Sequence, residues 1–147
     1  ICNGFQVLTE AGLLPGALLS NSSLEFICSP CFLKVERNDT PFTNAYRAGV
    51  VVQFPIAHHE GLFFLPDEEL KDLENHGQVV FRYASADGKT GSEFSPNGAL
   101  NGIAGIVNRE GNVLGLMPHP ERASEDLLGC SDGMGMWNSI KSWLKGR

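Results

Sequence analysis

The stretch ICNGFQVLTEAG, residues 1–12, decides the fold that the sequence predicts. Its apolar residues recur at helical spacing, so we expect a helix over residues 3–11 that is stopped by the glycine after it. If a strand ends at Ile1, then Cys2 lies at the corner between strand and helix, where Gly4 is expected to relieve crowding. Such a corner is typical of a nucleophile elbow, which lifts a reactive side chain above a sheet.

A helix that starts directly after Cys2 would also activate its thiol. The positive end of the helix dipole favours thiolate over thiol. The free N–H groups of the first turn, beginning with that of Asn3, are able to stabilise an oxyanion on a substrate. The sequence therefore predicts Cys2 as a nucleophile and Asn3 as a backbone donor.

Length and composition indicate one globular domain that binds no nucleic acid. The chain has 147 residues, of which 42% are hydrophobic and 19% charged, and its net charge is -6. An acidic chain with scattered basic residues is poorly suited to releasing counterions from a phosphate backbone. No apolar run approaches the length needed to span a membrane. No phosphate-binding glycine motif is present, so we expect no ATP or NAD site in this chain.

The cysteines are interpreted as reduced thiols of a cytoplasmic protein, because a chain of this length does not depend on disulfides. They are Cys2, Cys28, Cys31 and Cys130. The C-x-x-C spacing of Cys28 and Cys31 lacks the second pair that a zinc site requires, so we expect no metal there.

Strands and helices alternate along the rest of the chain. The expected strands are residues 24–37 (broken near Pro30), 50–56, 78–85, 103–108 and 113–117, and the further expected helices are residues 66–75 and 137–144. Near-continuous apolar strands favour an α/β sheet with helices on both faces, and the last two strands form a hairpin that makes part of the sheet antiparallel. Active sites of such sheets lie at the carboxyl ends of the strands.

The segment MPHPER, residues 117–122, supplies a partner for the thiol. His119 follows an apolar strand and lies between two prolines that favour extended backbone. Glu121 is two residues away and so lies on the same side of an extended segment, where its carboxylate would fix the imidazole tautomer. Each residue alone also fits a structural role, as a buried small cysteine or a hydrogen-bonded histidine. Together they predict a Cys2–His119–Glu121 relay.

The segment PIAHHEG, residues 55–61, is the third candidate. It follows an apolar strand, which favours a substrate-positioning loop, and an exposed polar loop is the alternative interpretation. Neighbouring histidine side chains diverge, so a metal site is disfavoured.

Taken together, these motifs resemble the class I glutamine amidotransferases. ICNGFQ resembles their nucleophile motif and MPHPER their His-x-Glu motif. LTEAGLLPGAL, PIAHHEG, IAGIVNREGNVLGLMPHPER and LLGCSDG extend the resemblance along nearly the whole chain, to the glutaminase subunits of phosphoribosylformylglycinamidine synthase. The fold implied is a flavodoxin-like amidotransferase sheet.

The resemblance implies a reaction and its partners. Cys2, His119 and Glu121 would hydrolyse glutamine through a glutamyl thioester, with Asn3, Gln6, His58 and Gly61 at the substrate. Ammonia would pass to a synthetase subunit that uses ATP and magnesium to make formylglycinamidine ribonucleotide in purine biosynthesis, and a small third subunit would bridge the two. The chain itself would need no cofactor.

The chain also departs from the family pattern. The family has a glycine before the isoleucine of its motif and an amino-terminal half-sheet with a glycine-rich loop, which supplies a second oxyanion donor. Residues 1–147 are therefore expected to be the C-terminal portion of a glutaminase domain, and a weak enzyme alone. Two alternatives stay open: another α/β cysteine hydrolase of peptidase or amidase type, and a non-catalytic module that binds a partner subunit.

Overall fold

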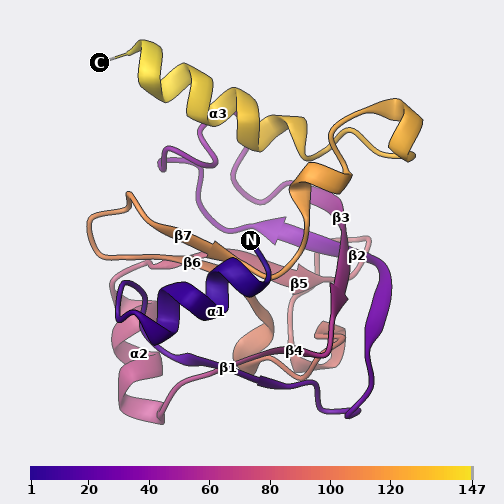
Figure 1. The fold of residues 1–147 in the computed structure, drawn as a ribbon. Helices are drawn as coiled ribbons and strands as arrows, with labels where there is room; N and C mark the ends of the chain where they lie inside the picture. Colours follow the sequence, from indigo (N-terminus) through magenta and orange to yellow (C-terminus); the bar gives the residue numbers. More distant parts are fainter. Residues whose placement is uncertain (147) are drawn as a thin grey trace.

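A curled five-stranded sheet forms the centre of the computed structural model, which describes residues 1–146 (Figure 1). Its strand order is β3-β2-β5-β6-β7, and every neighbouring pair is antiparallel. A separate two-stranded sheet pairs β1 with β4. The strands are β1 (Ala17–Ser20), β2 (Ile27–Val35), β3 (Val51–His58), β4 (Glu60–Phe64), β5 (Val79–Ala84), β6 (Ile103–Val107) and β7 (Leu114–Leu116).

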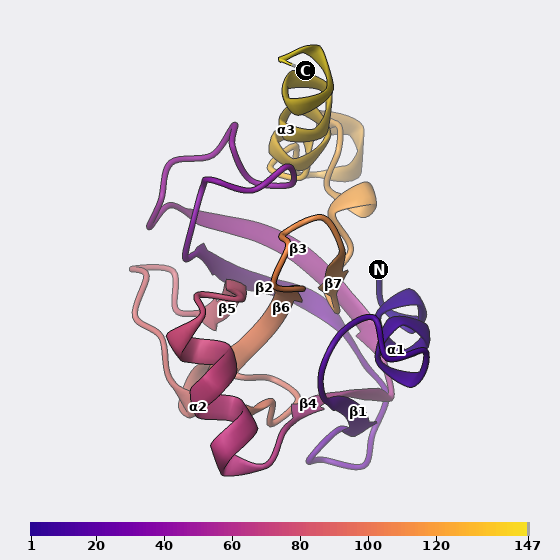
Figure 2. The ribbon, with the colours of Figure 1, turned by 90° about the vertical axis from the view of Figure 1, so that its left-hand side faces the viewer.

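Three α-helices surround the sheet, in the places that the sequence predicts. They are α1 (Asn3–Glu10), α2 (Asp67–Asn75) and α3 (Met134–Lys145). Figure 2 shows α1 and α2 on opposite sides of the molecule, with α3 beyond one end of the sheet. The short 3-10 helices are η1 (Ser92–Phe94), η2 (Leu100–Gly102), η3 (Pro120–Arg122) and η4 (Asp126–Leu128). None of the helices within residues 1–146 is both long and apolar enough to cross a bilayer.

The core lies where the sheet meets α1. On β3 the buried residues alternate along the strand, whereas β6 is buried throughout. Phe5 of α1 stacks on Phe63 of β4 with ring centroids 5.7 Å apart. A Cβ at Gly115 of β7 would lie 2.2 Å from the Phe5 ring, so the glycine allows α1 to approach the sheet. This packing places the start of α1 beside the end of β7.

The predicted break at Pro30 is wrong. β2 is one nine-residue strand that runs through it. Pro30 lies opposite Pro55 of β3. Antiparallel ladders alternate between pairs that exchange hydrogen bonds and pairs that do not, and two prolines facing each other fit a pair of the second kind.

Two further expectations need correction. Residues 55–58 belong to β3 itself and not to a loop, because the strand continues to His58 before the chain turns into β4. Gly4 relieves no crowding, because a Cβ built on it meets no atom of the described chain within 4 Å. The glycine faces outward from the first turn of α1.

Candidate active site

Cys2 occupies the turn between Ile1 and α1. Its backbone is in the left-handed region, with φ 50° and ψ −114°, which is costly for a residue with a side chain. Its N–H donates to the Leu116 carbonyl of β7 at 2.8 Å, and the helix begins at the next residue. The thiol is partly buried and packs against the edge of the core. A strained corner anchored on a strand end is the geometry of a nucleophile elbow.

His119 is oriented by Glu121. The imidazole Nδ1 lies 2.5 Å from Glu121 Oε1, and a carboxylate can only accept, so Nδ1 carries the proton. The ring is buried at 8% exposure, whereas the Glu121 side chain is 44% exposed. Nε2 is buried and has no hydrogen-bond partner among residues 1–146. A buried nitrogen lone pair without a partner is unusual in a folded protein. Such an atom is a feature of sites where a substrate binds.

The outer edge of β3 brings the two residues together. The His119 N–H donates to the Pro55 carbonyl at 2.8 Å, and the Cys2 thiol donates to the Ala57 carbonyl at 3.8 Å. Carbonyls two residues apart on one edge of a strand are about 7 Å apart. Cys2 and His119 are therefore held at successive positions along one strand edge.

A cavity of about 220 Å³ opens beside the thiol, and Cys2, Gln6, His58, His59 and Glu60 line it. Gln6 of α1 closes one side by donating to the Glu60 carbonyl at 3.3 Å and to its carboxylate at 3.2 Å. The backbone N–H of Asn3 has no partner within residues 1–146, as is usual for the first residue of a helix. The cavity is thus bordered by a thiol, an amide and a carboxylate, and the free N–H of Asn3 belongs to the residue next to the thiol.

His58 and Gly61 lie differently from what a substrate-contacting loop would require. His58 is 4% exposed, and its ring nitrogens face Asn21 Oδ1 at 3.0 Å and Asn97 Nδ2 at 3.5 Å. Burial lowers the pKa of His58 to about 4, so the ring is neutral at neutral pH. The Gly61 N–H and carbonyl are bonded to the same two asparagines. His58 borders the cavity and Gly61 lies against the His58 ring, and the polar atoms of both residues are already engaged.

Sequence reasoning missed Asn21 and Asn97. Asn21 follows β1, and Asn97 lies in a Pro-Asn-Gly triplet that is typical of a turn. Both are fully buried. No local pattern distinguishes a turn asparagine from one whose amide is buried against a distant strand, so only the tertiary structure reveals them.

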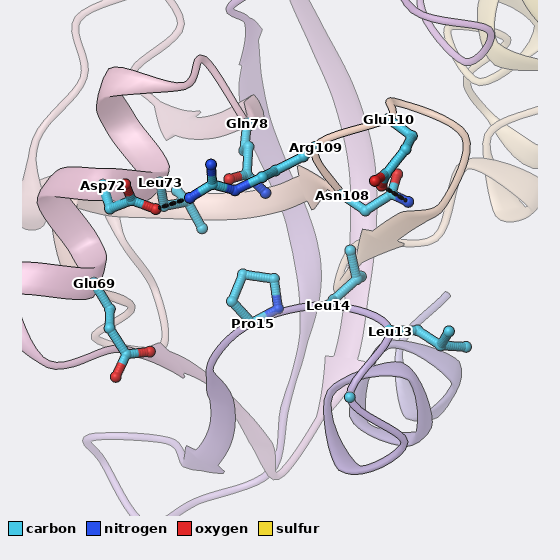
Figure 3. A pocket seen from close by; sticks show the side chains of 11 residues that line it. Leu13, Leu14, Pro15, Glu69, Asp72, Leu73, Gln78, Asn108, Arg109 and Glu110 are labelled. Atoms are coloured by element: carbon cyan, nitrogen blue, oxygen red, sulfur yellow. Dashed lines mark hydrogen bonds and ion pairs between the residues drawn. The ribbon is translucent and has the colours of Figure 1, made fainter.

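A larger cavity, of about 460 Å³, lies away from these residues (Figure 3). It lies between α2, residues 12–15 and the turn from β6 to β7, and Arg109 reaches across it to Asp72 with Nη2 and Oδ2 2.5 Å apart. Within it Arg109 is paired with Asp72, and neither Cys2 nor His119 borders it. The larger cavity is therefore separate from the residues that the sequence motifs single out.

Comparison with known proteins identifies the family. Residues 1–145 match the model of the CobB/CobQ-like glutamine amidotransferase domain. This chain is a member of that family. The resemblance found in the sequence motifs is thereby confirmed.

Relatives of this amidotransferase domain share about half of its residues. The phosphoribosylformylglycinamidine synthase subunit PurQ of Aquifex aeolicus is 52% identical over 97% of the chain, and that of Gloeobacter violaceus is 56% identical over 95%. A chain in the structure of PurLQS from Thermotoga maritima superposes with a TM-score of 0.82 at 48% identity over 97% of this chain. That likeness confirms the predicted fold class. This chain spans 63%, 60% and 59% of the three relatives' lengths.

Proposed function

We propose that the protein containing this chain is the glutaminase subunit of a phosphoribosylformylglycinamidine synthase. It would hydrolyse glutamine to glutamate and ammonia. The observation that carries the proposal is the buried Nε2 of His119, which has no partner among the described residues while Glu121 orients the ring. The backbone N–H of His119 and the thiol of Cys2 bond to the Pro55 and Ala57 carbonyls on the same edge of β3. The names of the relatives support the same activity.

In the first half of the reaction, Cys2 passes its proton to His119 Nε2 and its sulfur attacks the carboxamide carbon of glutamine. The carbonyl oxygen becomes an oxyanion, which the free Asn3 N–H stabilises. The C–N bond then breaks, and ammonia leaves with the proton from His119. A glutamyl thioester remains on Cys2.

In the second half, water attacks the thioester while His119 takes one of its protons. The C–S bond breaks, glutamate leaves, and the proton returns to the Cys2 sulfur. Glu121 stays ionised and stabilises the imidazolium that forms in both halves. Gln6, His58 and Gly61 form the wall against which the glutamine lies.

Ammonia is consumed by a partner. We propose a synthetase subunit that uses ATP and magnesium to make formylglycinamidine ribonucleotide, with a small third subunit bridging the two, and no cofactor in this chain. The relatives are named as one subunit of a synthase, which supports a synthetase subunit as the partner. We also propose that the protein is cytoplasmic, because a chain of this length does not depend on disulfides.

Exchange of single cysteines tests the activity. In the whole gene product, Cys2→Ala is expected to abolish ammonia release from glutamine. Cys130→Ala should leave it nearly intact, because the Cys130 thiol donates to the Gln53 carbonyl, and Cys130 does not line the cavity at Cys2. Similar losses in both variants would refute the assignment.

The same material separates the alternatives. A peptidase or amidase of similar fold would leave glutamine intact and would ignore glutamine analogues. A non-catalytic module would bind the synthetase partner equally well with and without Cys2 and would form no thioester in the complex.

A further inference from the structure

Two buried asparagines hold the corner between β3 and β4. The chain leaves the five-stranded sheet at His58 and enters the two-stranded sheet at Glu60, so a single residue separates strands of different sheets. Asn21 and Asn97 are both 0% exposed. Buried amides require partners for their donors and acceptors, and the corner supplies most of them.

Asn21 bonds to three residues of this corner. Its backbone N–H donates to the His59 carbonyl at 2.8 Å, and its Nδ2 donates to the His58 carbonyl at 2.9 Å. Its Oδ1 accepts the Gly61 N–H at 3.1 Å and also faces His58 Nδ1 at 3.0 Å. One side chain therefore determines the path of the chain from the end of β3 into β4.

Asn97 holds the corner from the other side. Its Nδ2 donates to the Gly61 carbonyl at 2.7 Å and to the Tyr83 hydroxyl at 3.0 Å, and it faces His58 Nε2 at 3.5 Å. Its Oδ1 accepts the Ala99 N–H at 3.1 Å. Because backbone N–H groups only donate and carbonyls only accept, both amide orientations are determined.

These orientations also determine the state of the His58 ring. Nδ1 must donate to the Asn21 oxygen, and Nε2 faces the Asn97 amide nitrogen, which cannot accept a proton from it, so the ring is neutral with its proton on Nδ1. The ring lies flat against Gly61, where an added Cβ would be 2.3 Å from its Cε1 atom. Ring, amides and glycine form one packed unit behind the cavity.

We propose that Asn21 and Asn97 are positioning residues of the glutamine pocket. Through His58 they hold the corner whose Ala57 carbonyl accepts the Cys2 thiol and whose Glu60 bonds to Gln6. The inference rests on the proposed glutaminase function. Neither asparagine lines the cavity, so each acts by placing the wall of the pocket relative to the sulfur.

Two alkylating reagents test the proposal in the whole gene product. A diazoketone analogue of glutamine reacts with Cys2 only from within the pocket, whereas iodoacetamide reports the thiol itself. Asn21→Asp and Asn97→Asp keep the side-chain shape and remove the amide donors, and exposed Asn38→Asp is the matched control. Adducts on each cysteine are counted by peptide mass spectrometry. Cys31, whose pKa burial raises to about 12, stays unlabelled while the fold persists.

Labelling of Cys2 by the analogue is expected to fall about 10- to 100-fold in both variants, because small misplacements of a site cost that much. Labelling of Cys2 by iodoacetamide in both variants should match that in the wild type. The Asn38→Asp protein should match the wild type with both reagents. If the analogue labels Cys2 in the wild type and labels it equally well in both variants, this inference is overturned and the proposed function is not. A wild-type protein that ignores the analogue would overturn the proposed function and the inference with it. Labelling of Cys31 in both variants would also contradict the inference, since the asparagines would then support the whole core.

Discussion

At the scale of single residues, Gly61 is a position near the site where a side chain has no room. An added methyl group would lie 2.3 Å from the buried His58 ring, which its two asparagines prevent from moving. We expect Gly61→Ala to lower the free energy of unfolding by about 1–3 kcal/mol, as overpacking does. Gly4→Ala is the matched control, because nothing described lies within 4 Å of its added Cβ. Equal urea denaturation curves for the two variants would contradict the packing around His58.

The neutral state of His58 makes stability depend on pH. Burial is the main cause that lowers its pKa from 6.5 to about 4, and the charge of a protonated His119 acts in the same direction. Between these two values only the unfolded chain binds the proton, so the free energy of unfolding falls as pH falls, by on the order of 2–3 kcal/mol at most. Above pH 6.5 the ring is neutral in both states and the loss is absent.

Urea denaturation at pH 7 and near pH 4.5 measures this loss in the wild type and in His58→Gln, with exposed His76→Gln as the control. We expect the loss to be smaller in His58→Gln only. A loss that is unchanged when His58 is replaced would show that other groups cause it.

At the scale of elements, the hydroxyl of Ser139 attaches α3 to the backbone at Ala45. Ser139 is fully buried, and its Oγ donates to the Gly135 carbonyl at 2.6 Å while accepting the Ala45 N–H at 2.8 Å. Ser139→Ala leaves that N–H without an acceptor, so we expect a loss of about 1–3 kcal/mol and faster hydrogen exchange at Ala45. Ser142→Ala, on the exposed side of the same helix, should change neither. Protection at Ala45 that survives Ser139→Ala would exclude this attachment.

The elements also show what a sequence pattern is able to predict. Helices α1 and α2 and the hairpin of β6 and β7 follow from apolar spacing, glycine stops and a four-residue turn, all of which are local signals. The two-stranded sheet of β1 and β4 joins segments 40 residues apart and was not predicted. The pairing of Pro30 with Pro55 is likewise a tertiary contact, which overrode the local tendency of proline to interrupt a strand.

The candidate site divides in the same way. Cys2, His119 and Glu121 lie in short motifs whose spacing predicts how they are presented. The roles of His58 and Gly61 depend on asparagines far away in the sequence. The motif alone therefore suggested a substrate-positioning loop, or an exposed polar loop, where the structure has a packed corner.

At the scale of the whole molecule, the chain is shorter than its relatives, of which it spans about three fifths. The family resemblance predicts a second oxyanion donor from a glycine-rich loop. We therefore expect low ammonia release from the 147-residue chain alone. A chimera in which the chain replaces its matching segment of the Aquifex aeolicus relative should be about a hundredfold or more faster, the usual effect of one such donor. Equal, high rates in both proteins would contradict this expectation.

The proposed glutaminase mechanism requires Cys2 to carry the glutamyl group during turnover. Acid quenching during glutamine hydrolysis by the whole gene product, followed by peptide mass spectrometry, measures this directly. We predict a glutamyl adduct on the peptide that contains Cys2 and none on the peptides with Cys28, Cys31 or Cys130. Steady ammonia release without an adduct on Cys2, or with the adduct on another cysteine, would contradict the account.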